Sequence, residues 1–330
     1  MSIKTLEAWL NIESISGNEA QFLIVLQTHL ESLGYTCSRQ ALSDSRWNLL
    51  ALGSKDPRLL FSTHVDTVPP FLPVLVGEDS IKGRGACDTK GGIYAMILAG
   101  EKLKEAGHQD FGYLFVVGEE VDHCGAKKSS DLDLKVNRII LCEPTLNTVV
   151  SAQKGMIKLL LKAEGIAAHS AYPEKGESAI HKLLNFLRLV DDFQWPTHDL
   201  LGPTTVNVGV IDGGVAPNVF APHASAQVLI RTVSDTTPFL EILTKMARDS
   251  GVQMEIPASN DPVFFDPPEG FPTKTVAFNT DATYLQGIAP IWLVGPGDIE
   301  DAHSVNEFIS FEQIEQGVDT YYKLALLVVK

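Results

Sequence analysis

Short apolar runs that alternate with helical segments are the feature that most constrains the fold of this 330-residue chain. Up to residue 150 we predict helices and strands in turn: helices at 5–12, 19–33 and 91–106, and strands at 48–52, 59–62, 112–117 and 138–142. Strands this short and this apolar are typical of a sheet that is buried on both faces. The pattern therefore predicts an α/β domain with a mixed, mostly parallel sheet and helices on both faces.

A different order of elements runs from about residue 150 to residue 257. Predicted there are, in turn, strand 154–163, helix 177–192, strands 204–211 and 224–232, helix 237–249 and strand 252–256. This βαββαβ order is that of a ferredoxin-like α+β unit. The first pattern then resumes with a strand at 291–294 and a helix at 310–327. We therefore predict an α/β domain at 1–151 and 259–330, interrupted by an inserted domain at 152–258.

Charge and composition exclude several classes of partner. Lys and Arg total 26 against 41 Asp and Glu, so the formal net charge of −15 opposes binding to nucleic acid or to an anionic membrane. No apolar run approaches the ~18 residues of a membrane span, and the first residues lack the pattern of a secretion signal. We expect a cytoplasmic protein. Its four cysteines are too sparse for a disulfide scaffold.

Metal-competent side chains follow three of the predicted strands. His64 and Asp66 come after the run 59–62, Glu119 and Glu120 after 112–117, and Glu143 after 138–142. Because ligands of open α/β sheets gather outside the carboxyl ends of the strands, we expect these side chains to lie together.

Two further residues complete the predicted site. Asp88 lies in a Gly-rich loop before a helix, where the backbone can approach a ligand closely, and His303 lies near the end of the chain. One imidazole and carboxylate oxygens per ion are typical of zinc or a similar divalent metal, and one carboxylate can bridge two ions. The sequence predicts a two-metal hydrolase site.

Taken together and in order, these segments resemble the M20 family of co-catalytic metallopeptidases and deacylases, and the resemblance covers nearly the whole chain. The matching motifs are His64-x-Asp66, Gly83-Arg84-Gly85-x-x-Asp88-x-Lys90-Gly91, Glu119-Glu120, Cys142-Glu143-Pro144-Thr145, Gly165-Ile166-Ala167-Ala168-His169-Ser170, Asn279-Thr280-Asp281-Ala282 and Ala302-His303-x-x-Asn306-Glu307.

The resemblance implies a role for each residue of the site. The ligands of one metal would be His64, Asp88 and Glu143, and those of the other Asp88, Glu120 and His303. Glu119 would be the general base, and Asp66 would hydrogen-bond His64 and fix its tautomer. We expect Glu119 and Glu120 to diverge because successive extended residues point to opposite sides. A cis peptide is expected after Asp88. Zinc is the expected metal, with cobalt or manganese as alternatives.

Other residues near the predicted site are interpreted as structural. His123 and Cys124 follow the glutamate pair, and we interpret them as a polar loop residue and an apolar filler rather than as further ligands.

The inserted domain resembles the lid and dimerisation domain of the same family. His169 matches a lid histidine that reaches the active site of the partner in dimeric members, where it stabilises the oxyanion. Asn218 and Arg231 match residues that bind the substrate carboxylate or the reaction centre, and a guanidinium offers a bidentate fork for a carboxylate. The resemblance implies a homodimer formed through this domain.

The resemblance also implies the reaction. A glutamate at position 143 is typical of the deacylase and carboxypeptidase branches, and Gly295-Pro296-Gly297-Asp298 resembles the acetylornithine and acetylcitrulline deacetylases. We expect a two-metal amidohydrolase that removes the acyl group from an N-acyl amino acid, most like N-acetylornithine deacetylase. An exopeptidase, either a carboxypeptidase or a dipeptidase, is the alternative. A non-catalytic metal or amino-acid binder is disfavoured by the intact Glu119.

Overall fold

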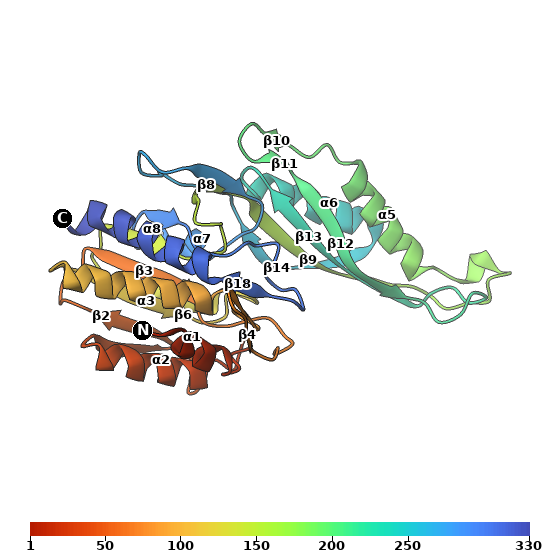
Figure 1. Ribbon diagram of the computed structural model, residues 1–330. Coiled ribbons are helices and arrows are strands. Elements are labelled where there is room, and N and C mark those ends of the chain that lie inside the picture. The colour runs from red at the N-terminus through yellow and green to blue at the C-terminus, as the bar shows by residue number, and fades with distance from the viewer. The chain divides into compact units, whose positions relative to one another are not determined.

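The computed structural model describes residues 1–330, which form two compact units (Figure 1). The first unit comprises residues 1–151, 265–274 and 280–330, and the second comprises residues 152–264 and 275–279. None of the helices combines the length and the apolar character that crossing a lipid bilayer requires.

A six-stranded mixed sheet forms the centre of the first unit. Its strands lie in the order β1 (Thr36–Ala41), β2 (Trp47–Leu52), β6 (Phe111–Val116), β3 (Leu59–His64), β7 (Arg138–Leu141) and β17 (Ile291–Leu293). The four strands from β6 to β17 are parallel, whereas β2 is antiparallel to both β1 and β6. The prediction of a mixed, mostly parallel sheet is confirmed. Strand β1 was not predicted because its six residues, TCSRQA, are mostly polar and exposed.

Helices cover both faces of this sheet. On one face lie α1 (Ile3–Leu10), α2 (Ala20–Ser32), α3 (Lys90–Glu105) and α8 (Phe311–Val329), whose apolar side chains pack with alternate residues of the strands in one core. On the opposite face, the short helices α4 (Cys124–Ser129) and α7 (Ala282–Leu285) contact each other, and α4 contacts β2 and β6 while α7 contacts β17. Helix α8 begins with a capping box between Ser310 and Gln313, which satisfies backbone N–H groups of its first turn.

Small strands complete the layout. Strands β4 (Leu75–Val76), β5 (Ser80–Lys82) and β18 (Phe308–Ser310) form one three-stranded sheet in the order β18-β5-β4. Strands β15 (Val263–Phe264), β8 (Val149–Gln153) and β16 (Thr273–Val276) form another in that order.

The second unit has the predicted βαββαβ order. It contains β9 (Gly155–Glu164), α5 (Ala179–Asp192), β12 (Thr205–Gly213), β13 (His223–Thr232), α6 (Thr237–Ser250) and β14 (Val252–Asn260), with the minor elements η1 (Pro173–Lys175), β10 (Thr197–His198) and β11 (Gly202–Pro203). The four long strands are antiparallel in the order β12-β13-β9-β14, and α5 and α6 pack side by side on the sheet over a separate apolar core. Strands β12 and β14 are therefore its edges.

Candidate metal centre

The carboxyl ends of three neighbouring strands bring the candidate ligands together. Strand β3 ends at His64, β6 leads into Glu119 and Glu120, and β7 leads into Glu143. These strands are adjacent and parallel in the order β6-β3-β7, so their ends meet at one edge of the sheet.

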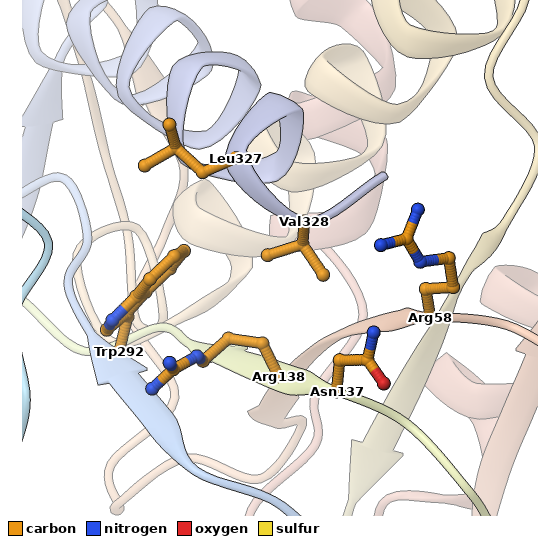
Figure 2. Close-up of a pocket in the computed structure, with 6 residues that line it drawn as sticks. All are labelled: Arg58, Asn137, Arg138, Trp292, Leu327 and Val328. Carbon is orange, nitrogen blue, oxygen red and sulfur yellow. The ribbon is translucent and has the colours of Figure 1, made fainter. Parts of the chain in front are cut away.

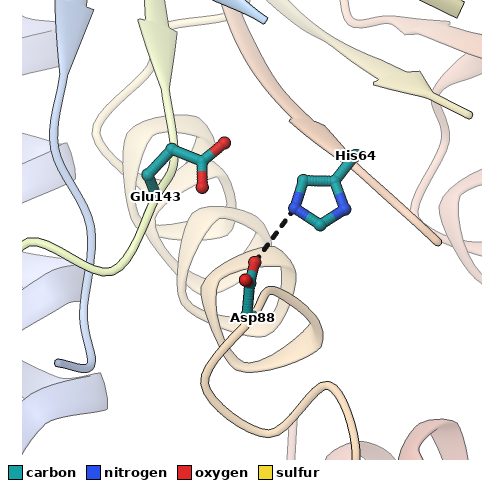
Figure 3. Close-up of side chains that lie close together, drawn as sticks. All are labelled: His64, Asp88 and Glu143. Atoms are coloured by element: carbon teal, nitrogen blue, oxygen red, sulfur yellow. Dashed lines mark hydrogen bonds and ion pairs between the residues drawn. The ribbon is translucent and has the colours of Figure 1, made fainter. Parts of the chain in front are cut away.

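Three buried side chains, His64, Asp88 and Glu143, form the first set of candidate ligands (Figure 3). The Nε2 atom of His64 lies 3.0 Å from Oδ1 of Asp88. The carboxylate of Glu143 points toward the same space, and its buried Oε1 has no hydrogen-bond partner.

The second set consists of Asp88, Glu120 and His303. The Nε2 atom of His303 lies 3.0 Å from Oε1 of Glu120 and 3.2 Å from Oδ2 of Asp88. Asp88 therefore presents one carboxylate oxygen to each set, which is the arrangement of a carboxylate that bridges two ions.

The donor atoms of both sets fit divalent metal ions. Each set offers one imidazole nitrogen and carboxylate oxygens, as zinc sites do. Burial, followed by the nearby carboxylate of Asp88, raises the pKa of Glu120, and burial raises that of Glu143 well above its usual value. Hydrogen bonding to Asp88 and Glu120 raises the pKa of His303 to about 10. A cation at each set would offset this concentration of negative charge and would satisfy the unpaired oxygen of Glu143.

A buried ion pair holds the loop that carries Asp88. Oε1 of Glu307 accepts hydrogen bonds from the backbone N–H groups of Cys87 (3.0 Å) and Asp88 (3.1 Å), while Oε2 accepts one from Nη1 of Arg84 (2.6 Å). The peptide between Asp88 and Thr89 is cis, as expected. Glu307 thus fixes the backbone of the bridging residue from the far end of the chain.

Asp66 hydrogen-bonds His64 as predicted, but through its backbone oxygen rather than its carboxylate. Nδ1 of His64 lies 2.9 Å from the backbone oxygen of Asp66, but 3.6 Å from its carboxylate. The carboxylate instead accepts hydrogen bonds from the backbone N–H groups of Gly118, Glu119 and Glu120, at 2.9, 3.1 and 3.3 Å. The main-chain oxygen of Asp66 thus contacts His64, while its carboxylate holds the backbone of the segment 118–120.

Glu119 and Glu120 contact different partners, as predicted, but not because they are extended residues. Strand β6 ends at Val116, and the two glutamates lie in a turn. Gly118, at a φ of +78°, begins this turn in the left-handed region, and an added Cβ there would meet the Cys124 Sγ at 2.6 Å. The carboxylate of Asp66 accepts hydrogen bonds from the backbone of this turn. In the turn, Glu120 contacts His303 and Glu119 lies beside His123. Burial, and then the charge of Glu143, raise the pKa of Glu119 well above its usual value.

His123 lies in the loop just before α4, as interpreted from the sequence, but it is buried. It is 6% exposed and its Nδ1 lies 2.9 Å from Oδ1 of Asp281 and 3.7 Å from Oε1 of Glu119. Its φ of +56° is in the left-handed region, as is that of His303 at +61°. Backbone in this region is uncommon for non-glycine residues and is enriched at functional sites. Sequence spacing carries no signal for this contact, because Asp281 is 158 residues away.

The remaining predicted site residues belong to the second unit. His169 and Asn218 are exposed and close together: His169 forms an isolated bridge with Val219, and the backbone oxygen of Asn218 accepts a hydrogen bond from Ser170. Arg231 lies near the other end of β13, with its guanidinium 3.9 Å from the sulfur of Met156. His169 and Arg231 are thus at opposite ends of the sheet of this unit.

A separate pocket lies at the other end of the parallel strands (Figure 2). It has a volume of about 300 Å³ and is lined by Arg58, Asn137, Arg138, Trp292, Leu327 and Val328. Arg58 precedes β3 and Arg138 begins β7, so both lie at the amino ends of strands whose carboxyl ends carry His64 and Glu143. No carboxylate or histidine lines this pocket, and the candidate metal ligands lie elsewhere.

Comparison with known proteins gives consistent matches, and the matched relatives cover 95–96% of the chain. The M20 peptidase dimerisation domain matches residues 151–250. The chain is 36% identical over 326 residues to a peptidase M20 domain-containing protein of Schizosaccharomyces pombe, with 96% of this chain and 82% of that protein covered. It is 35% identical over 367 residues to a probable carboxypeptidase of Neosartorya fischeri, with 95% and 83% covered.

Solved structures share the fold of this chain. A tripeptidase from Staphylococcus aureus superposes with a TM-score of 0.82 at 20% identity, covering 99% of this chain and 97% of that one. A protein from Bacillus subtilis described as a dinuclear metal-binding peptidase of the M20 family superposes with a TM-score of 0.72 at 14% identity, covering 99% and 97%.

Proposed function

The chain belongs to the M20 peptidase family, and we propose that it is a two-metal hydrolase that cleaves the amide bond to an amino acid with a free α-carboxylate. The position of Asp88 is the observation that carries this proposal. Its two carboxylate oxygens lie 3.0 and 3.2 Å from the imidazoles of His64 and His303, which belong to two separate ligand sets. A bridging carboxylate between two such sets is the hallmark of a hydrolase with two adjacent ions.

Each residue of the first unit has a role in this proposal. His64, Asp88 and Glu143 would hold one ion, and Asp88, Glu120 and His303 the other. When bound, two divalent ions supply Lewis-acid polarisation of the scissile carbonyl and lower the pKa of water at the site. Zinc fits the donor set, and cobalt and manganese are alternatives.

Glu119 is the proposed general base and acid. Glu119 belongs to neither of the two ligand sets that share Asp88. It is adjacent to Glu120 in the sequence, and its side chain is largely buried. It would take a proton from the attacking water and return it to the leaving amine, which are the two transfers that amide hydrolysis needs. Asp66 would support both steps, because its carboxylate orients the backbone of the two glutamates and its carbonyl orients His64.

The second unit is the proposed lid and dimerisation domain. Arg231 would bind the α-carboxylate of the substrate through its planar fork, Asn218 would assist at the carboxylate or the reaction centre, and His169 would stabilise the oxyanion. The family match over residues 151–250 supports a homodimer formed through this unit.

The proposed substrate class follows from the α-carboxylate that Arg231 would bind. A C-terminal peptide bond and an N-acetyl amino acid both place an amide next to a free α-carboxylate, and they differ only in the acyl side. The name of the relative from Neosartorya fischeri favours a carboxypeptidase. Deacetylation of N-acetylornithine is the second candidate, favoured by the segment Gly295-Pro296-Gly297-Asp298.

A substrate panel tests the proposal. Release of amine is measured for N-acetylornithine, N-acetylcitrulline, N-succinyl-diaminopimelate and dipeptides, each dipeptide with a free and an amidated C-terminus. Every reaction is repeated with chelator, and again after zinc, cobalt or manganese is restored. We expect hydrolysis that chelator abolishes, that one metal restores and that amidation of the C-terminus abolishes.

The outcomes separate the candidates. Turnover of free dipeptides identifies an exopeptidase, whereas turnover of acetylated or succinylated amino acids alone identifies a deacylase. Glu119→Gln protein, purified in parallel, serves as the control for contaminating peptidases. If protein that contains two ions per chain hydrolyses no substrate of the panel, the result contradicts the proposal and favours a metal or amino-acid binder.

A further inference from the structure

A third cluster in the first unit has the same composition as the two candidate ligand sets. Glu119, His123 and Asp281 supply one imidazole and two carboxylates, with donor atoms that all lie within 4.8 Å of one another. The family resemblance gives His123 and Asp281 no ligand role, and neither belongs to the two sets around Asp88. The chain therefore carries three groups that each hold one histidine and two acids.

One oxygen of the third cluster has no partner. Asp281 is 1% exposed and its Oδ2 makes no hydrogen bond, although its Oδ1 lies 2.9 Å from Nδ1 of His123. The first ligand set shows the same feature at Oε1 of Glu143. A buried and unpaired carboxylate oxygen is costly, and a bound cation is one way to satisfy it.

Distances within the cluster also match those of the other two. Donor atoms of a tetrahedral zinc ion, bonded at about 2.0–2.1 Å, lie roughly 3.3 Å apart. In the third cluster Nδ1 of His123 lies 2.9 Å from Asp281 and 3.7 Å from Glu119, values on either side of that separation. In the first two sets the corresponding distances are 3.0 and 3.2 Å.

We propose that Glu119, His123 and Asp281 form a third divalent-metal site whose occupation inhibits the enzyme. A cation bonded to a carboxylate lowers the affinity of that carboxylate for a proton, so an ion at this site weakens Glu119 as a base. The inhibitory effect rests on the proposed function, since it requires Glu119 to be the base. Binding of the third ion does not, because it depends only on the cluster.

Metal stoichiometry tests the site without reference to activity. Wild-type protein loaded with two zinc ions per chain is dialysed against rising Zn²⁺, and bound zinc is measured by elemental analysis. We expect a third ion in the wild type and only two in His123→Asn. Asparagine tolerates the left-handed backbone at position 123, so this variant keeps the turn. Asp281→Asn is the second variant, and His181→Asn, on the exposed surface of α5, is the matched control.

Two results of this experiment overturn the site. The first is the absence of a third ion in wild-type protein, and the second is an equal third ion in wild type, His123→Asn and Asp281→Asn. Because dialysis needs no substrate, the measured number of bound ions tests the site even if the protein does not catalyse the proposed reaction.

The activity of the same samples tests inhibition. For the wild type and His181→Asn, turnover should rise until two ions are bound and then fall at least about tenfold as the third binds, since loss of a general base costs about 10² or more. For His123→Asn the ratio of turnover at excess zinc to turnover at two ions should stay near one. An equal fall in His123→Asn and in wild type would contradict inhibition through this site.

Discussion

Asp66 contacts both a ligand of the first set, His64, and the backbone of Glu119 and Glu120. Its backbone oxygen lies 2.9 Å from Nδ1 of His64, and its carboxylate accepts the N–H groups of Glu119 and Glu120 as well as the hydroxyl of Ser16, at 2.6 Å. Burial alone would raise the pKa of this carboxyl, but the nearby imidazole of His64, together with hydrogen bonds from the Ser16 hydroxyl and the Glu119 amide, holds it below the usual value. An ionised Asp66 thus fixes a metal ligand and the proposed base together.

At the residue scale, Glu119→Gln tests the base. The amide keeps the shape of the side chain but cannot take a proton, so kcat should fall at least about 10²-fold while both ions stay bound. Steady-state kinetics and elemental analysis of the same sample measure the two effects. The exposed Glu78, in the same unit, gives the control variant Glu78→Gln, which should turn over normally. Near-normal kcat in Glu119→Gln would remove this residue from the mechanism.

A second prediction at this scale concerns the proton that His303 loses when a metal ion binds. Because hydrogen bonds to Asp88 and Glu120 raise the pKa of His303 to about 10, its imidazole is protonated at pH 7 in protein without metal. A metal ion requires the neutral imidazole, so binding should release this proton. Affinity should then rise about tenfold per pH unit between pH 7 and the pKa of His303, and fall in acid.

Calorimetry measures this release. Zinc is titrated into metal-free protein in two buffers of different ionisation enthalpy at pH 7, and the difference in heat gives the number of protons released. His303→Gln should release fewer protons than the wild type. Equal release by the two proteins would show that the proton of His303 does not take part.

Single residues of the site were predictable where a motif carries them. His64, Glu120 and Glu143 follow strand ends, Asp88 lies in a Gly-rich loop and His303 lies in the motif Ala302-His303-x-x-Asn306-Glu307, and the structure brings them together as expected. The contact of His123 with Asp281 was missed, because it depends on a turn after β6 and on a segment 158 residues away. Tertiary contacts of this kind leave no periodicity in the sequence.

At the scale of elements, long and periodic segments were predictable and short ones were not. Helix α5 and strand β13 were predicted to within two residues at each end, because their apolar positions repeat with the period of a helix or a strand. Strands β4, β5 and β18 have only two or three residues each and form by pairing with one another. Nothing local in the sequence selects such strands, yet β18 follows Glu307 and so positions the Asp88 loop.

Glu307→Gln tests how far this connection stabilises the first unit. The variant leaves the guanidinium of Arg84 buried without its counter-charge, and breaking a buried pair typically costs about 3–5 kcal/mol. Because glutamine still offers an oxygen to the amides of Cys87 and Asp88, we expect a loss of about 3 kcal/mol in the free energy of unfolding. Urea unfolding followed by circular dichroism measures it.

The exposed pair of Lys102 and Asp319 provides the control for this prediction. Its side chains are 45% and 56% exposed, so Asp319→Asn should change the free energy of unfolding by less than about 1 kcal/mol. Equal losses in Glu307→Gln and Asp319→Asn would show that burial of the Arg84 pair has no special effect on stability.

At the scale of the whole molecule, the second unit presents an unpaired strand edge. Strand β12 lies at the edge of its sheet and is exposed along most of its length, with Val210 49% and Ile211 56% exposed. The other edge, β14, carries Glu255 and Pro257, which are typical of edges protected from pairing. We therefore propose that two copies associate along β12.

Ile211→Lys tests this edge. The variant places a charged lysine on the pairing edge of both copies, and we expect the dimer dissociation constant to rise at least about tenfold. Light scattering and sedimentation at several protein concentrations measure the mass in solution. Ile256→Lys, on β14, is the control and should leave the dimer intact. Dissociation by Ile256→Lys alone would move the interface to the opposite edge.

The placement of His169, Asn218 and Arg231 gives the dimer a catalytic consequence. His169 and Asn218 lie beyond the end of β13 that begins at His223, and Arg231 lies eight residues further along this strand, about 27 Å away at 3.4 Å per residue. One substrate of the size of an acyl amino acid cannot reach both ends from a single copy. If all three residues serve one site, as we propose, then the residues at one end of this sheet must come from the partner, and we predict that these are His169 and Asn218.

Mixed dimers test this arrangement in full. His169→Ala and Glu119→Gln proteins are each inactive as homodimers if both residues are essential. In a mixed dimer, the copy that keeps Glu119 receives an intact His169 from its partner, so one of the two sites works. Random exchange makes about half of the dimers mixed, which predicts about one quarter of wild-type activity. If His169 acted within its own chain, every site of a mixed dimer would carry one defect. Absence of recovery in dimers proven to be mixed, by affinity tags of two kinds, would therefore place His169 in the site of its own chain or outside catalysis.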